Sequence, residues 1–118
     1  MEKTLTAAAV IIELKKIGSP AKTKDSAWYF KTGKGEYGYG DVFVGVTVPE
    51  QRKMAKRFSG LSLGEIEKLL RSKIHECRLT ALVILVGQFN RGDSRTRADI
   101  VRLYLRNRSR VNNWDLVD

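Results

Sequence analysis

The chain has 118 residues, of which 42% are hydrophobic and 30% charged, so it is a globular protein long enough to bury the core of one domain. Its 22 Lys and Arg against 13 Asp and Glu give a net charge of +9. This excess favours a polyanionic partner such as nucleic acid, although charge can also serve solubility alone. A single cysteine, Cys77, excludes a disulfide framework, and one His with one Cys excludes a zinc site.

The N-terminal part predicts two helices and a long irregular segment. Helically spaced apolar residues occupy about residues 3–17, and Gly18-Ser19-Pro20 ends that helix. A second, short helix is expected over residues 21–31, followed by a glycine-rich loop over about 32–46. The apolar run at 7–12 is too short to cross a membrane and lacks the order of a signal peptide, so we expect a cytoplasmic protein.

The rest of the chain has helical periodicity. One helix is expected from Val48 to about Ser59-Gly60, and Ser62 with Glu65 predicts a capping box that begins the next. Residues 75–89 are apolar nearly all round, which predicts a central buried helix, and residues 95–107 form another. Helices of this length joined by short loops, without a convincing strand, predict an all-α fold of stacked helix pairs.

The glycine-rich loop contains a misleading motif. Gly33-Lys34-Gly35-Glu36-Tyr37-Gly38 matches G-x-G-x-x-G, but a dinucleotide site requires a strand before the motif and a helix after it. Here a helix is expected before it and no helical pattern follows, so we reject a dinucleotide site. The loop either simply connects helices or lies against a backbone phosphate.

Two groups of residues are candidates for nucleic-acid contact. The three consecutive aromatic residues Trp28, Tyr29 and Phe30 cannot all face inward on a helix. A ring with a polar tip beside a lysine, such as Tyr29 beside Lys31, suits a nucleic-acid surface. The alternative is that these rings belong to the core, with one of them at its rim. Further along, four arginines share one helix face with no acid among them, opposite an apolar face. They form either a solvated face or a phosphate contact. The arginines are Arg95, Arg102, Arg106 and Arg110, and the apolar residues are Ile100, Val101, Tyr104 and Leu105.

The C-terminus places an aromatic ring beside a carboxylate. Trp114 and Asp118 are four residues apart, so they share a face of the helical turn that Asn112-Asn113 would cap. One fixed carboxylate can stabilise the positive charge that develops on a sugar as its base leaves, and a cationic base leaves without being protonated. The alternative is structural: Trp114 anchors a core, and Asp115 with Asp118 favours a helix N-terminus.

An ordered set of motifs resembles the AlkD family of bacterial DNA alkylation-repair glycosylases. The resemblance covers nearly the whole chain after about residue 19. The matching residues are Trp28-Tyr29-Phe30-Lys31-Thr32-Gly33, Gly35-Glu36-Tyr37-Gly38, Gly40-Asp41, Phe43-Val44-Gly45-Val46, Val48-Pro49, His75-Glu76, Arg78 with Ala81-Leu82, and Asn112-Asn113-Trp114-Asp115-Leu116-Val117-Asp118.

The resemblance implies a fold and a chemistry. The fold is an all-α superhelix of HEAT-like repeats, and the substrate is double-stranded DNA carrying cationic N3- or N7-alkylated purines. By resemblance Asp118 is the catalytic residue, Trp114 packs against the lesion-bearing nucleotide, and Tyr29 contacts DNA. The family needs no metal and no cofactor, and the protein would act in the bacterial cytoplasm on the nucleoid.

Family members are longer than this chain, and their C-terminal repeats complete the DNA cleft. We therefore expect residues 1–118 to be the N-terminal part of a single, truncated HEAT-like domain, weakly active or inactive alone. Its exposed C-terminal end could support a homodimer. The competing hypothesis is a non-catalytic helical-repeat module that binds nucleic acid or a protein.

Overall fold

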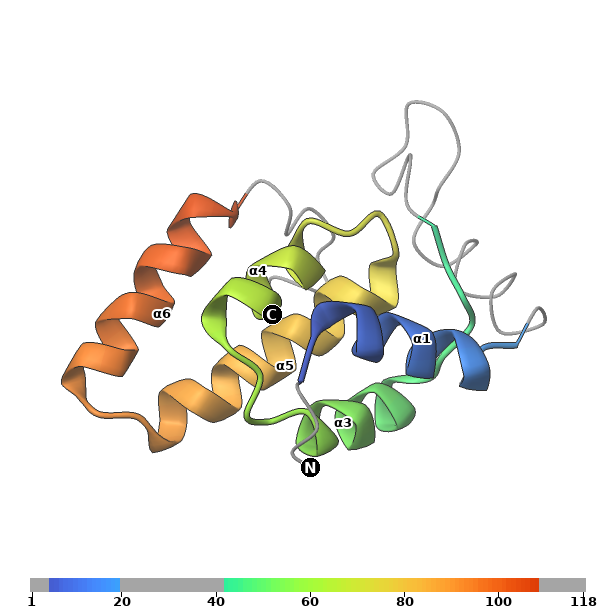
Figure 1. The fold of residues 1–118 in the computed structure, drawn as a ribbon, viewed down its shortest axis with the longest axis horizontal. Helices are drawn as coiled ribbons and strands as arrows, with labels where there is room; N and C mark the ends of the chain where they lie inside the picture. The colour runs from blue at the N-terminus through green and yellow to red at the C-terminus, as the bar shows by residue number, and fades with distance from the viewer. Residues whose placement is uncertain (1–4, 20–41, 109–118) are drawn as a thin grey trace.

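The fold of the chain is helical, as the sequence predicts. The computed structural model describes residues 5–19 and 42–108, and within these ranges no residue belongs to a strand. An isolated parallel bridge joins Val42 to Ile74. The helices, drawn in Figure 1, are α1 (Ala7–Ile17), α3 (Val48–Arg57), α4 (Leu63–Leu70), α5 (His75–Arg91) and α6 (Ser94–Arg106). The expected helix at 21–31 and most of the glycine-rich loop lie outside the described residues.

Side-chain caps determine where these helices begin. Thr6 accepts a hydrogen bond from the Ala9 N–H at 3.1 Å, so α1 begins at Ala7 rather than near residue 3. A full capping box forms at α3, where the Thr47 and Glu50 side chains bond each other's backbone N–H. Each cap satisfies backbone donors that the first turn of a helix leaves without partners.

The capping box expected at α4 forms only in part. The Ser62 hydroxyl accepts a hydrogen bond from the Glu65 N–H at 3.3 Å, as predicted. The Glu65 carboxylate does not return to Ser62; it accepts the Ala7 N–H of α1 at 2.9 Å. The Ala7 N–H can take this bond because it lies in the first turn of α1 and has no partner within its own helix. Glu65 thus joins the first turns of α1 and α4.

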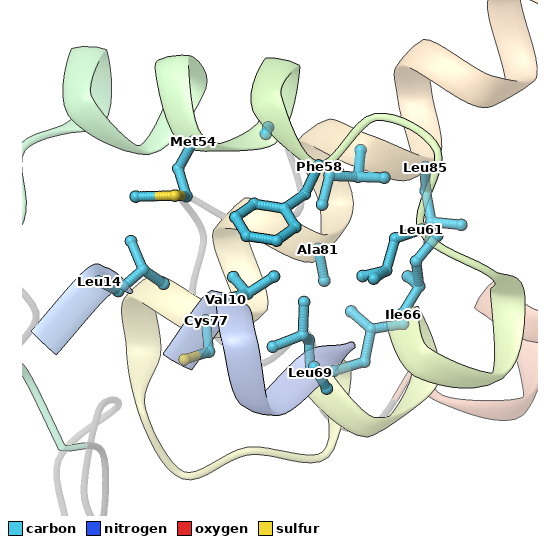
Figure 2. Packing of buried hydrophobic residues seen from close by; sticks show 14 of the residues in the cluster. Val10, Leu14, Met54, Phe58, Leu61, Ile66, Leu69, Cys77, Ala81 and Leu85 are labelled. Atoms are coloured by element: carbon cyan, nitrogen blue, oxygen red, sulfur yellow. The ribbon is translucent and has the colours of Figure 1, made fainter. Parts of the chain in front are cut away.

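Helix α5 is the central element, which confirms the prediction from its apolar sequence. It contacts α1, α3, α4 and α6, and Figure 1 shows it running through the middle of the fold. The apolar side chains that α5 and its neighbouring helices bury provide the main driving force for folding. The close view in Figure 2 shows the cluster that they form. Its labelled members are Val10, Leu14, Met54, Phe58, Leu61, Ile66, Leu69, Cys77, Ala81 and Leu85.

The single cysteine is part of this core and is chemically protected. Burial raises the pKa of Cys77 to about 11 from 9.0, so the fold favours the neutral thiol. We expect iodoacetamide at pH 8 to alkylate the native chain about 100-fold more slowly than the urea-unfolded chain, because only the thiolate reacts. Mass spectrometry of timed samples measures both rates, and equal rates would contradict the burial of the thiol.

Candidate nucleic-acid interface

The residues predicted to contact DNA divide into two sets in the structure. Arg95, Arg102 and Arg106 all lie on α6, within the described residues. The described residues do not include the predicted catalytic residue Asp118, the aromatic Trp114 or the pair Tyr29 and Lys31, and they do not include Arg110, the fourth of the predicted arginines.

Helix α6 lies at one side of the fold and exposes its arginines. The Asp93 carboxylate caps its first turn by accepting the Thr96 N–H at 2.8 Å. Ile100 and Leu103 are buried, and α6 contacts α4 and α5. Arg95, Arg102 and Arg106 are exposed. The sequence periodicity therefore places these three arginines correctly on the outside of the helix.

The expectation that no acid accompanies these arginines is wrong. Asp99 of the same helix lies 3.6 Å from the Arg102 guanidinium. Glu67 of α4 accepts a hydrogen bond from Arg106 Nε at 3.0 Å and another from the Asn107 amide at 2.7 Å. Two of the three predicted arginines that the structure describes therefore already have carboxylate partners within the chain.

The Glu67 carboxylate makes the docking of α6 sensitive to acid. Its hydrogen bonds with Arg106 and then Asn107 hold the pKa of Glu67 below its ordinary value of 4.5, so the fold favours the ionised form. This contribution to stability is complete above pH 4.5 and is lost as the pH falls through the lowered pKa. We expect Glu67→Gln to flatten the fall in melting temperature between pH 6 and pH 3, measured by circular dichroism. Parallel curves for both proteins would contradict this role.

The apolar face expected opposite the arginines is only partly buried. Ile100 is buried, but Val101 is 46% exposed and Leu105 is 55% exposed. The buried line of α6 instead runs through Ile100, Leu103 and the polar Asn107. This difference arises because α4 and α5 cover only a narrow stripe of α6. The homodimer expected at the C-terminal end remains a prediction.

A second basic surface, which sequence reasoning did not single out, covers α3. Gln51, Met54 and Ala55 are buried on one side of this helix. The opposite side exposes four cations, Arg52, Lys53, Lys56 and Arg57. The four cations are visible in the sequence, but an exposed charged face is common on helices and does not by itself indicate a ligand.

A buried glutamate, which sequence reasoning also missed, fixes the end of the glycine-rich loop. Glu76 is only 1% exposed, although it lies on the helix expected to be apolar nearly all round. Its carboxylate accepts three backbone hydrogen bonds, from Val44 at 3.1 Å, Gly45 at 2.9 Å and Val46 at 3.2 Å. These charge-assisted bonds replace the water that a buried carboxylate loses. The peptide adopts this arrangement because Gly45 has a φ of 78°.

Further backbone bonds tie the two sides of residues 20–41 together. The Ser19 N–H donates to the Gly45 carbonyl at 3.0 Å, so the described residues before and after this segment are neighbours. The Val42 N–H donates to the Lys73 carbonyl at 2.9 Å, and the Phe43 and His75 rings stack with centroids 4.9 Å apart. The start of α5 therefore anchors the residues that follow this segment, and Ser19, which precedes it, is joined to them through Gly45.

Neither a metal cluster nor a membrane span is present in the described part of the chain. Over residues 5–19 and 42–108, no three His, Cys, Asp or Glu side chains gather in a way that could hold a metal ion. None of the helices in these ranges is long and apolar enough to cross a bilayer.

Comparison with known proteins yields one clear match. A family model described as DNA alkylation repair enzyme matches residues 10–118. Searches of curated proteins and of solved structures found no significant match. The matched range contains every described helix residue from Val10 onwards, and it extends to Trp114 and Asp118.

Proposed function

The chain belongs to the family of DNA alkylation repair enzymes, and from this membership we propose that it hydrolyses the N-glycosidic bond of cationic N3- or N7-alkylated purines in double-stranded DNA. The observation that carries the proposal is the extent of the family match, which spans residues 10–118 and so includes the terminal Trp114 and Asp118. The net charge of +9 supports a DNA substrate.

The proposed chemistry needs one carboxylate. Alkylation makes the base cationic, so the bond from the base to C1′ breaks with its electron pair moving to the base, which leaves neutral and needs no proton. Positive charge then develops on the sugar, and the Asp118 carboxylate stabilises it electrostatically. A water held by Asp118 adds to C1′, and its proton passes to the carboxylate and then to solvent.

Trp114 and Tyr29, assigned from the resemblance, and Lys31, assigned from its position beside the aromatic rings, bind the DNA in this proposal. Trp114 packs against the lesion-bearing nucleotide, where an aromatic ring can stack on the sugar or base. Tyr29 and Lys31 contact the duplex. The helices form part of a HEAT-like stack that presents these residues, and no cofactor takes part in the reaction.

The test is the release of free 7-methylguanine from methylated duplex DNA, measured by chromatography. It uses the 118-residue chain and the longest natural gene product that contains it. We expect the longest natural product to release the base, to leave an abasic site and to ignore unmethylated DNA. A non-catalytic helical-repeat module would bind both duplexes equally and release no base, and that result would overturn the proposal.

A further inference from the structure

We infer that the solvent face of α3, formed by Arg52, Lys53 and Lys56, contacts the phosphate backbone of duplex DNA. The inference rests on the proposed function only in taking DNA as the partner. It adds a binding surface that the sequence reasoning did not assign, and it predicts that this surface contributes more to affinity than the arginines of α6.

The three cations lie on a rigid helix. The capping box of Thr47 and Glu50 fixes the first turn of α3, and Gln51 Nε2 donates to the Val46 carbonyl at 2.8 Å. Packing against α5 buries the opposite side of the helix. The position of the positive charge is thus set by folded structure, so little backbone order has to be gained on binding.

These cations have no carboxylate partner among the described residues. Within residues 5–19 and 42–108, Arg52, Lys53 and Lys56 make no ion pair closer than 4.0 Å, whereas the neighbouring Arg57 lies 3.5 Å from Glu13. We therefore leave Arg57 out of the surface. Three adjacent cations without a partner bind counterions loosely in solution, and a phosphate backbone can replace those counterions without breaking an internal contact.

The arginines of α6 differ in this respect. Arg102 is paired with Asp99, and Arg106 with Glu67. Arg97 donates to the Phe89 carbonyl at 3.0 Å, and its guanidinium lies 5.1 Å from the centre of the Phe89 ring. Of the three predicted arginines that lie on α6, Arg95 is the one without an ion pair among the described residues. Because the others would have to share or lose a partner, α6 should contribute about one full phosphate contact.

The experiment compares the salt dependence of binding to an undamaged duplex. One variant carries Arg52→Gln, Lys53→Gln and Lys56→Gln; the comparison variant carries Arg95→Gln, Arg102→Gln and Arg106→Gln. Both lose three positive charges, so any effect of net charge alone is equal. Fluorescence anisotropy gives the affinity of each for a labelled duplex over a range of salt concentrations, and circular dichroism checks that each is folded.

A plot of log affinity against log salt has a negative slope, and each phosphate contact contributes about 0.9 to its magnitude. We expect this magnitude to decrease by about 3 for the α3 variant and by about 1 for the α6 variant. If the triple α6 variant is unfolded, two double variants replace the triple ones. The magnitude of the slope is then expected to decrease by about 2 for Arg52→Gln/Lys56→Gln and by about 1 for Arg95→Gln/Arg102→Gln. An equal fall for the two surfaces, or a larger fall for α6, would overturn the inference, as would an unaltered chain that does not bind DNA.

This result is independent of catalysis. The duplex carries no lesion, so the slopes do not depend on base release. Base release that survives Asp118→Asn would remove the catalytic proposal and leave the α3 inference intact. Conversely, an unchanged slope in the α3 variant of an active glycosylase would remove only the α3 inference.

Discussion

Replacing Asp118 with Asn is expected to slow the release of 7-methylguanine by about 100-fold or more, because removing one preorganised electrostatic group from an active site costs about this much. The amide keeps the size of the carboxylate but carries no negative charge, so it cannot stabilise the cationic sugar. The measurement is a single-turnover rate with the longest natural product containing this chain, at enzyme concentrations that saturate the DNA.

A matched control lies three residues away. Asp115→Asn removes the same charge from the same terminal segment, and we expect a rate within about 3-fold of the unaltered protein, since Asp115 takes no part in the proposed reaction. If Asp118→Asn released the base as fast as Asp115→Asn, the assigned mechanism would be wrong. Circular dichroism of both variants shows whether either has lost helix.

The second large effect concerns stability. Glu76→Gln is expected to lower the free energy of unfolding by about 3 kcal/mol at pH 7, the cost of disrupting charge-assisted hydrogen bonds at a buried site. A carboxylate accepts the N–H groups of Val44, Gly45 and Val46 with two oxygens. An amide has only one accepting oxygen, and its NH₂ group would place hydrogen-bond donors against the backbone N–H groups, which are also donors. Urea unfolding followed by circular dichroism measures the change.

Glu13→Gln is the control for this substitution. Glu13 is also a helix glutamate, but it pairs at the surface with Lys16 at 3.7 Å and Arg57 at 3.5 Å. Exposed pairs contribute little, so we expect a loss of less than about 1 kcal/mol. Equal losses for the two variants would contradict a special role for Glu76. If the Glu76→Gln variant were completely unfolded, its loss of stability would be larger than expected but would still support the role of Glu76.

Much of the fold can be predicted from local sequence. The periodicity of apolar residues identifies α1, α3, α4, α5 and α6, because each helix must bury one side against its neighbours. The polar residue before α4, Ser62, also marks its start correctly. These signals are available from sequence because they depend on residues within a few positions of one another.

Long-range polar contacts could not be predicted in the same way. Glu65 fits a local capping box, yet its carboxylate bonds Ala7, 58 residues earlier. Glu76 occupies one polar position in an apolar helix, and no spacing rule indicates that three backbone N–H groups surround it. In both cases the partner becomes close only after folding.

The same limit applies to the candidate interface. Helical spacing places Arg95, Arg102 and Arg106 on one exposed face, but the pairing of Arg106 with Glu67 spans 39 residues and depends on how α4 packs on α6. Asp99, by contrast, lies four residues after Arg95 and could have been assigned to this face from spacing alone. The family was recognisable from the sequence because its motifs occur in order, and the family match confirms that recognition.

We propose that one carboxylate suffices for base release because the departing base is already cationic. The most direct measurement compares base release from one duplex that carries a single 7-methylguanine with release from the same duplex carrying hypoxanthine, which is neutral. We expect release of 7-methylguanine and no detectable release of hypoxanthine from the longest natural product containing this chain. Comparable rates for the two bases would contradict the claim, since a neutral base needs a proton donor to leave.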